Sequence, residues 1–388
     1  MLNLDQQLTE AANIGDQEGI KKYVAEGANV NALAIGDYSP LYFALRHMPG
    51  IQKDILGTVK LLVENGADVN LKMKDNETAL ITAAEGGQLE AVEYLIEQGA
   101  DVNATLDSGA NALHLIAEKI EGRPMNYTVT VTVDGKPKTL TDPDEIRKAT
   151  GSHPDDEHRD LLKIVKLLLK AGIDTEAKNL NGQTPIYTAT AVEDDDLIDM
   201  IIKAGADLNT HDKWGITVLS YVCRQGNLAL VKKFVQAGAD VNAADDIGFT
   251  PLHEAAENQH VDVLKYLLEQ GADPNQGLKK AYKEYPVGTT PFDLAQKTNN
   301  KTIMELLSQG QKFELRESIE SKDWTWSEHG QESGVKIEND LLIWYTQDEK
   351  NRSGGGGMAQ QLSDFAQNGP IATAPKEVLE EIKYYLKK

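Results

Sequence analysis

A short segment with two histidines and three acidic residues is the part of the sequence whose residue types best suit a metal site. His153 and His158 flank Pro-Asp-Asp-Glu, and both imidazole and carboxylate groups ligate transition metals. The same residues also suit the first turn of a helix, because Pro154 fits the first helical position and acidic side chains there interact favourably with the helix dipole. We favour the helix, and the sequence predicts no metal and no cofactor.

Other groups that could carry catalysis lack the neighbours that catalysis requires. Cys223, the single cysteine, has no accompanying His and Asn pattern of a thiol nucleophile, so we interpret it as a small buried residue. The four glycines at 354–357 lack the Lys and Ser/Thr that follow a phosphate-binding loop. The sequence therefore predicts a protein that is not an enzyme. A catalytic C-terminal region, with His329 and Asp340 in a pocket lined by tryptophans, is the alternative.

The charge of the chain limits the kind of partner that it can bind. Asp and Glu number 61 against 39 Lys and Arg, which gives a formal net charge of −22. A chain this acidic repels the phosphates of nucleic acids and of anionic membranes. We therefore expect no nucleic acid, no membrane and no small-molecule substrate, but a protein partner. A basic surface on that partner would be complementary, unless the charge serves only solubility.

Three features of the sequence point to the cytoplasm. A single cysteine allows no intrachain disulfide, which fits a reducing compartment. The first residues lack the basic and apolar regions of a secretory signal. No apolar run is long enough to span a bilayer. We therefore expect a cytoplasmic protein.

Two short strings recur along the chain, mostly 33 residues apart. The first is of the Gly-Ala-Asp-Val-Asn type and begins at Gly27, Gly66, Gly99, Gly172, Gly205, Gly238 and Gly271. The second is of the Thr-Pro-Leu-His-x-Ala type and begins at Ser39, Thr78, Asn111, Thr184, Thr217, Thr250 and Thr290. Thr-Pro suits the cap and first position of a helix, whereas the glycine suits a left-handed residue after a helix.

A second helix is predicted between the two strings, because apolar residues recur there at offsets 0, 3, 6 and 7. Val261, Leu264, Leu267 and Leu268 show the pattern, which defines one face of a helix. Each repeat is therefore a helix, a tight turn, a second helix and an extended finger. Such a repeat cannot bury its apolar face alone, so neighbouring repeats must stack.

On the period and the two strings, the chain resembles the ankyrin-repeat family over about residues 4–309. The resemblance implies an α fold, an ankyrin-repeat solenoid of about eight helix-turn-helix-finger repeats. These repeats lie near 4–34, 35–73, 74–106, 107–179, 180–212, 213–245, 246–284 and 285–309. We expect residues 1–309 to form the repeat domain, and residues 310–388 a small α+β C-terminal domain or cap. In the family the His of the second string, kept at His114 and His253, bonds neighbouring fingers.

Two regions depart from the repeat. An insertion at about 122–157 alternates Val129, Val131 and Val133 with Thr, followed by Asp134-Gly135, which predicts a β-hairpin. In the C-terminal region, residues 313–326 and 335–345 read as strands, whereas residues 358–367 and 375–386 read as helices.

The resemblance also implies a concave binding face built from finger tips and first helices. The finger tips are apolar only in the sixth and seventh repeats, and the finger of the seventh repeat is lengthened by basic and tyrosine residues. Aromatic residues and Arg are enriched in interface anchors. The candidate partner-binding residues are Trp214, Tyr221, Arg224, Ile247, Phe249, Lys279, Lys280, Tyr282 and Lys283.

The predicted function is that of a non-catalytic scaffold that recognises a partner protein through the concave face. One alternative is an inhibitor or immunity protein that neutralises an enzyme or toxin, for example a basic nuclease. Another alternative is an effector whose C-terminal domain is catalytic.

Overall fold

The computed structural model describes residues 2–46, 54–121, 129–133, 136–140, 145, 148 and 154–307, and four strands between residues 324 and 361. The chain divides into two compact units. The N-terminal unit consists of Met1–Leu219 and Phe234–Asp240, and the C-terminal unit of Ser220–Lys233 and Val241–Lys388.

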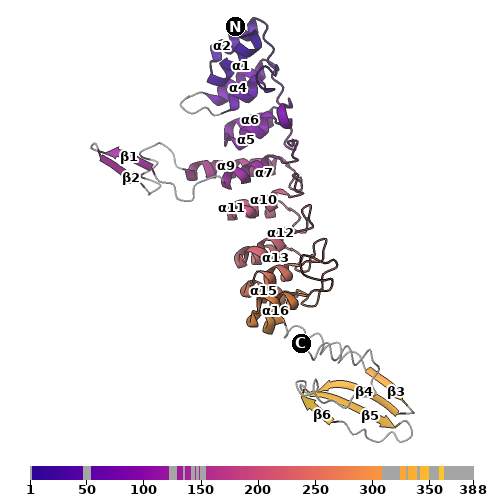
Figure 1. The fold of residues 1–388 in the computed structure, drawn as a ribbon. Helices are drawn as coiled ribbons and strands as arrows, with labels where there is room; N and C mark the ends of the chain where they lie inside the picture. Colours follow the sequence, from indigo (N-terminus) through magenta and orange to yellow (C-terminus); the bar gives the residue numbers. More distant parts are fainter. Residues whose placement is uncertain are drawn as a thin grey trace. The chain divides into compact units, whose positions relative to one another are not determined.

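Paired helices make up the N-terminal unit, in which they stack in chain order with the fingers along one side (Figure 1). The first five helices are α1 (Leu4–Ile14), α2 (Gln17–Ala25), α3 (Pro40–Leu45), α4 (Ile55–Glu64) and α5 (Ala79–Glu85). They are followed by α6 (Leu89–Glu97), α7 (Ala112–Glu121), α9 (Pro154–Lys170), α10 (Pro185–Ala191) and α11 (Asp195–Lys203). A short 3-10 helix, η1, spans Lys74–Asn76.

Helices and a four-stranded antiparallel sheet occur in the C-terminal unit. The helices are α12 (Val218–Gln225) and α13 (Leu228–Gln236), which each share residues with the N-terminal unit, and α14 (Pro251–Glu257), α15 (Val261–Glu269) and α16 (Pro291–Thr298). Residues 301–307 are also helical. Each of the eight predicted repeats thus contains a helix pair, which confirms the predicted α-helical repeat.

The sheet follows the chain order β3 (Trp324–Glu328), β4 (Gln331–Glu338), β5 (Leu341–Asp348) and β6 (Met358–Gln361). Residues 335–345, predicted as one strand, are divided between β4 and β5. Residues 358–361, predicted to begin a helix, instead pair with Leu341–Trp344, because pairing with an existing strand overrides local helix propensity. The remaining predicted helical residues, 362–367 and 375–386, lie outside the described residues.

Within the insertion, β1 (Val129–Val133) pairs antiparallel with β2 (Lys136–Leu140). Val133 stands opposite Lys136, which leaves two residues between the strands. These two residues, Asp134 and Gly135, lie outside the described residues. The helix predicted at Pro154 is present as α9, which begins at that residue.

Caps at both ends of the helices follow the sequence pattern. The glycine of the first string has a φ between 84° and 102° in all seven copies, which is left-handed backbone that favours glycine. At the other end, Ser39, Thr78, Thr250 and Thr290 each accept a hydrogen bond from the N–H three residues on. The predicted capping residues therefore set the helix boundaries.

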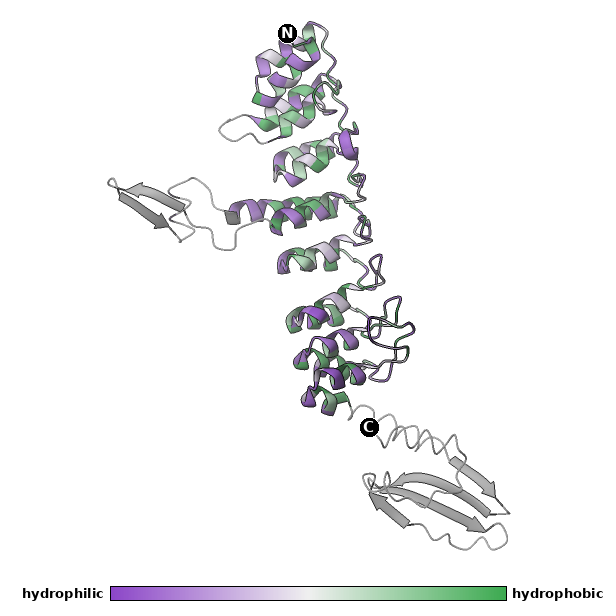
Figure 2. Ribbon diagram, viewed as in Figure 1, coloured by the Kyte–Doolittle hydropathy of each residue, from purple (hydrophilic) through white to green (hydrophobic). Residues whose placement is uncertain are grey.

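The core lies between stacked helices, which carry hydrophobic and hydrophilic residues on different faces (Figure 2). Of the four apolar positions of each second helix, those at offsets 3 and 6 are the most buried. In α15 these are Leu264 and Leu267, which are fully buried, whereas Val261 and Leu268 are half-buried. Val263, at offset 2, is also buried, so the face that packs against the neighbours includes a position outside the predicted pattern.

Asparagine side chains link each finger to the next. The asparagine that ends the first string accepts a hydrogen bond from the backbone N–H of the aspartate in the following finger, as from Asn70 Oδ1 to Asp101 at 2.7 Å. Its Nδ2 donates to the carbonyl of the following glycine, as from Asn70 to Gly99 at 2.9 Å. The same pair of bonds is made by Asn31, Asn209 and Asn242. One side chain thus satisfies two backbone groups of its neighbour.

One finger breaks this pattern with a glutamate. Glu176 Oε1 accepts from the N–H of Asp207 at 3.0 Å, in place of an asparagine. Its Oε2 is buried and has no hydrogen-bond partner. A carboxylate also has no donor for the carbonyl of Gly205, which is the equivalent of the acceptor in the other fingers.

Glu176→Asn is therefore expected to raise the free energy of unfolding by about 1 kcal/mol, because it replaces an unpartnered buried oxygen with a donor. Urea denaturation of the full chain measures the difference. The matched control is Asn70→Glu, which should lower the free energy of unfolding at an intact link. Equal stability of Glu176→Asn and the unmodified chain would contradict this account.

Two buried histidines link first helices to the following fingers, as the resemblance implies. His253 is fully buried; its Nδ1 accepts from the N–H of Thr250 at 3.2 Å and its Nε2 bonds the carbonyl of Thr289 at 3.2 Å. His114 bonds the carbonyl of Gln183 in the same way, at 3.0 Å. This arrangement needs a neutral ring with its proton on Nε2. Burial lowers the pKa of His253 to about 4, against an ordinary value of 6.5.

Acidification from pH 7 to pH 5 is expected to remove about 1–2 kcal/mol of the stability that neutral His253 contributes. The unfolded chain binds a proton below about pH 6.5, whereas folded His253 binds none until about pH 4. At this residue the unfolded state therefore holds more protons in this window, so the contribution of His253 to stability falls as the pH falls. Urea denaturation at pH 7 and pH 5 measures the change. His253→Gln should show a smaller difference between the two pH values, and an unchanged difference would contradict the assignment.

Candidate protein-binding site

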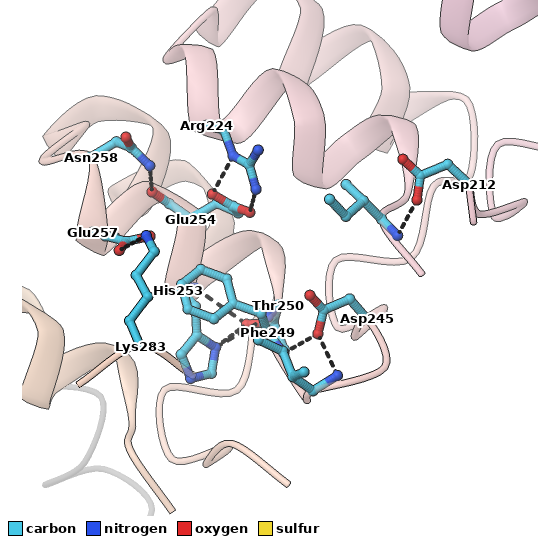
Figure 3. Close-up of polar contacts among 12 residues, drawn as sticks. Asp212, Arg224, Asp245, Phe249, Thr250, His253, Glu254, Glu257, Asn258 and Lys283 are labelled. Carbon is cyan, nitrogen blue, oxygen red and sulfur yellow. Dashed lines mark hydrogen bonds and ion pairs between the residues drawn. The ribbon is translucent and has the colours of Figure 1, made fainter. Parts of the chain in front are cut away.

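Two aspartates shape the finger tips that the sequence singled out. Asp245 Oδ1 accepts hydrogen bonds from the N–H groups of Ile247 and Phe249, at 3.0 and 2.7 Å (Figure 3). In the preceding finger, Asp212 Oδ1 accepts hydrogen bonds in the same way from the N–H groups of Trp214 and Ile216, at 2.9 and 3.0 Å. Such Asx turns hold the tip backbone in a fixed conformation.

Trp214 is exposed at its tip in the N-terminal unit. Its side chain is 53% exposed, and the Lys213 ammonium lies 4.4 Å from its ring centroid. Lys213 Nζ also donates to Asn181 Oδ1 at 2.6 Å, and the N–H of Lys213 to the carbonyl of Asn181 at 2.9 Å. The tip is therefore ordered while its aromatic surface faces solvent, as a binding anchor requires.

Leu180, on the neighbouring tip, was missed by the sequence analysis. It is 75% exposed and precedes Asn181, to which Lys213 is bonded. The tip positions equivalent to Trp214 and Ile216 are the polar Asn181 and Gln183 in this finger, and Leu180 stands one residue before them. Leu180 and Trp214 thus place exposed apolar side chains on two adjacent fingers of the N-terminal unit.

Phe249 is a packing residue, which corrects its inclusion among the partner-binding residues. It is 4% exposed. Its ring centroid lies 5.1 Å from that of His253 and 5.9 Å from that of Tyr282, the latter edge to face. The Phe249 ring is buried because it packs against these neighbours. Ile247 is half-buried and remains the accessible apolar residue of this tip.

Arg224 on α12 is held by a buried carboxylate. Its Nε donates to Glu254 Oε2 at 3.0 Å, and its Nη2 donates to Glu254 Oε1 at 2.7 Å (Figure 3). The Glu254 side chain is almost fully buried, whereas about half of the Arg224 side chain is exposed. Burial raises the pKa of Glu254, and the bonds from Arg224 offset part of that rise. Arg224 therefore has a structural contact on one side and an exposed surface on the other. Tyr221, one turn earlier, is half-buried.

The lengthened finger of the seventh repeat is a small hairpin. Tyr282 and Tyr285 exchange backbone hydrogen bonds of 2.9 and 2.8 Å. Lys283 Nζ lies 4.7 Å from the Tyr282 ring centroid and 3.4 Å from Glu257 Oε1. Lys279 and Lys280 are exposed.

The structure therefore groups the candidate residues of the C-terminal unit into connected sets. Phe249, Tyr282 and Lys283 form one set with Glu257. Ile247, Lys279 and Lys280 form another through backbone bonds to the Ile247 carbonyl. Arg224 and Glu254 form a third. Trp214 belongs to the N-terminal unit.

Groups suited to metal binding or catalysis are occupied in other ways. Within the part of the chain that the structure describes, no cluster of three or more His, Cys, Asp or Glu side chains is placed to hold a metal ion. His158 Nε2 lies 3.4 Å from Asp194 Oδ2. Cys223 is buried, as predicted, and burial raises the pKa of its thiol well above the ordinary value.

Among the described residues, no helix is both long enough and apolar enough to cross a bilayer.

Comparison with known proteins covers both units. A family model for ankyrin repeats, described as three copies, matches residues 8–105, 50–124 and 188–277. These matches together span more than half of the 388 residues. No curated protein matches the chain.

Proposed function

Since the chain belongs to the ankyrin-repeat family, we propose that it is a non-catalytic scaffold that binds another protein through the concave face of its repeats. The observation that carries the proposal is the ordered, exposed tip of Trp214. Trp214 has a 53% exposed ring on a backbone held by Asp212, with the Lys213 ammonium over that ring, so it can contribute binding energy with little loss of conformational freedom. On the C-terminal unit, Tyr221, Arg224 and Ile247 are proposed as partner-binding residues.

The test is affinity capture on the immobilised full chain, with mass spectrometry of the bound proteins. Capture counts as support only if a protein bound by the unmodified chain is lost from Trp214→Ala. The matched controls are Asp75→Ala and Ser108→Ala at equivalent tips, which should retain it. Loss from all three variants alike, or from none, would contradict the proposal.

A more specific candidate is an inhibitor or immunity protein whose target is basic, for example a nuclease. The net charge of −22 favours it, since complementary charge accelerates association and excludes other partners. If the target is basic, its affinity for the chain should fall steeply as salt is raised. An enzyme that binds the chain should also lose activity on binding.

The domain organisation is proposed from the same repeat pattern. Residues 1–309 would form the repeat domain, and residues 310–388 a separate C-terminal domain. Limited proteolysis that releases a stable fragment ending near residue 309 would support this boundary.

A compartment that keeps Cys223 reduced, such as the cytoplasm, is proposed for the protein.

A further inference from the structure

Backbone hydrogen bonds join the two ends of the lengthened finger of the seventh repeat. The N–H of Leu278 donates to the carbonyl of Thr289 at 3.0 Å, and the N–H of Gly288 to the carbonyl of Leu278 at 2.8 Å. Farther along, Tyr282 and Tyr285 bond one another in both directions. The residues between 278 and 289 therefore form a backbone-bonded hairpin.

Side chains fix the hairpin to the neighbouring helices. Lys283 pairs with Glu257 of α14, and Lys297 of α16 pairs with Glu284 of the hairpin. Lys297 also lies 4.5 Å from the Tyr285 ring centroid. The cations in these contacts are therefore compensated by carboxylates, and the hairpin is held before any partner arrives.

Lys279 and Lys280 differ from these compensated cations. Their N–H groups both donate to the carbonyl of Ile247, at 2.8 and 3.2 Å, which holds them at the tip of the preceding finger. Both side chains are exposed, and neither makes an ion pair with any residue in the described part of the chain. Two uncompensated positive charges thus lie side by side in a chain whose net charge is −22.

Apolar side chains accompany these charges. Ile247 is half-buried. Val287 is 63% exposed, and the next residue, Gly288, donates its N–H to the carbonyl of Leu278, which directly precedes Lys279. We name Ile247, Lys279, Lys280 and Val287 the lysine tip. It combines an apolar surface with two cations on a fixed backbone.

We propose that the lysine tip binds an acidic segment of the partner protein, in which carboxylates pair with Lys279 and Lys280 while an apolar side chain covers Ile247 and Val287. The proposal rests on the proposed scaffold function and specifies the chemistry of one contact. Charge complementarity selects an acidic segment, because like charge would be repelled at this tip. Asp246 is exposed beside Ile247 and is expected to weaken this contact.

The experiment selects binders from a displayed library of random 12-residue peptides against the full chain. We expect the enriched peptides to carry more Asp and Glu than the library, next to a large apolar residue. Charge reversal in Lys279→Glu with Lys280→Glu should weaken an enriched peptide at least about tenfold, or about 1.4 kcal/mol. Asp246→Asn should tighten it.

The matched control changes the net charge by the same amount elsewhere. Lys265→Glu with Lys301→Glu, at two other exposed lysines, should leave the affinity within about twofold. Enriched peptides that are neutral or basic, or equal weakening by both double variants, would overturn the proposal. Binding of a 20-nucleotide single-stranded DNA at the lysine tip would overturn it in favour of nucleic acid.

Failure of this inference can be told from failure of the scaffold function. If a captured partner is lost from Trp214→Ala but retained by Lys279→Glu with Lys280→Glu, the lysine tip is excluded while the scaffold stands. If no protein depends on Trp214, the scaffold proposal fails on its own test.

Discussion

Arg224→Ala is expected to lower the free energy of unfolding by about 2–4 kcal/mol. The substitution leaves the buried carboxylate of Glu254 without the two hydrogen bonds that Arg224 donates. Leaving an ionised group buried without a partner costs more free energy than its hydrogen bonds contributed to the stability of the intact protein. Urea denaturation at pH 7 measures the loss.

A double variant separates this cost from the net contribution of the ion pair. Arg224→Met with Glu254→Met removes both charges and keeps similar volume, so it should recover most of the stability that Arg224→Ala loses. Arg224→Ala that is as stable as the unmodified chain would show that Glu254 has another partner or reaches water.

Trp214→Ala is expected to weaken partner binding by roughly thirty-fold, or about 2 kcal/mol. The ring is exposed and its removal opens no cavity, so the free energy of unfolding should change little. Isothermal titration with a captured partner measures the affinity, and urea denaturation the stability.

Asp75→Ala and Ser108→Ala are the controls for Trp214→Ala, because their side chains stand at equivalent tips. Each should change the affinity less than about threefold. A result in which Trp214→Ala is neutral while these controls weaken binding would place the site in the earlier repeats. Weakened binding together with a lowered melting transition would instead assign Trp214 to packing.

The fold could be predicted from the sequence wherever a backbone position demands one residue type. The left-handed turn after each second helix admits glycine at low cost, so the glycines marked the repeats. The capping threonines and prolines did the same for the first helices. Such signals are local, so the insertion within the fourth repeat leaves them recognisable.

The candidate site was harder to predict, because the exposure of a side chain depends on residues far away in sequence. Phe249 and Ile247 are both apolar, yet Phe249 packs against Tyr282 and is buried, whereas Ile247 is only half-buried. Arg224 is paired with Glu254, which is 30 residues away in the sequence. Neither contact has a local signature. Side-chain packing between residues far apart in the sequence decides both.

The asparagine links between fingers have a consequence for how the repeats open. In stacked repeats, stability is the sum of what each repeat contributes and of the coupling to its nearest neighbours. Each two-bond link raises that coupling, so neighbouring repeats open together. At Glu176 the coupling is weaker, since one oxygen is unpartnered. Local opening that begins at one end is therefore expected to halt at such weaker links, and amide hydrogen exchange would show a boundary between cooperative segments of the N-terminal unit at Glu176.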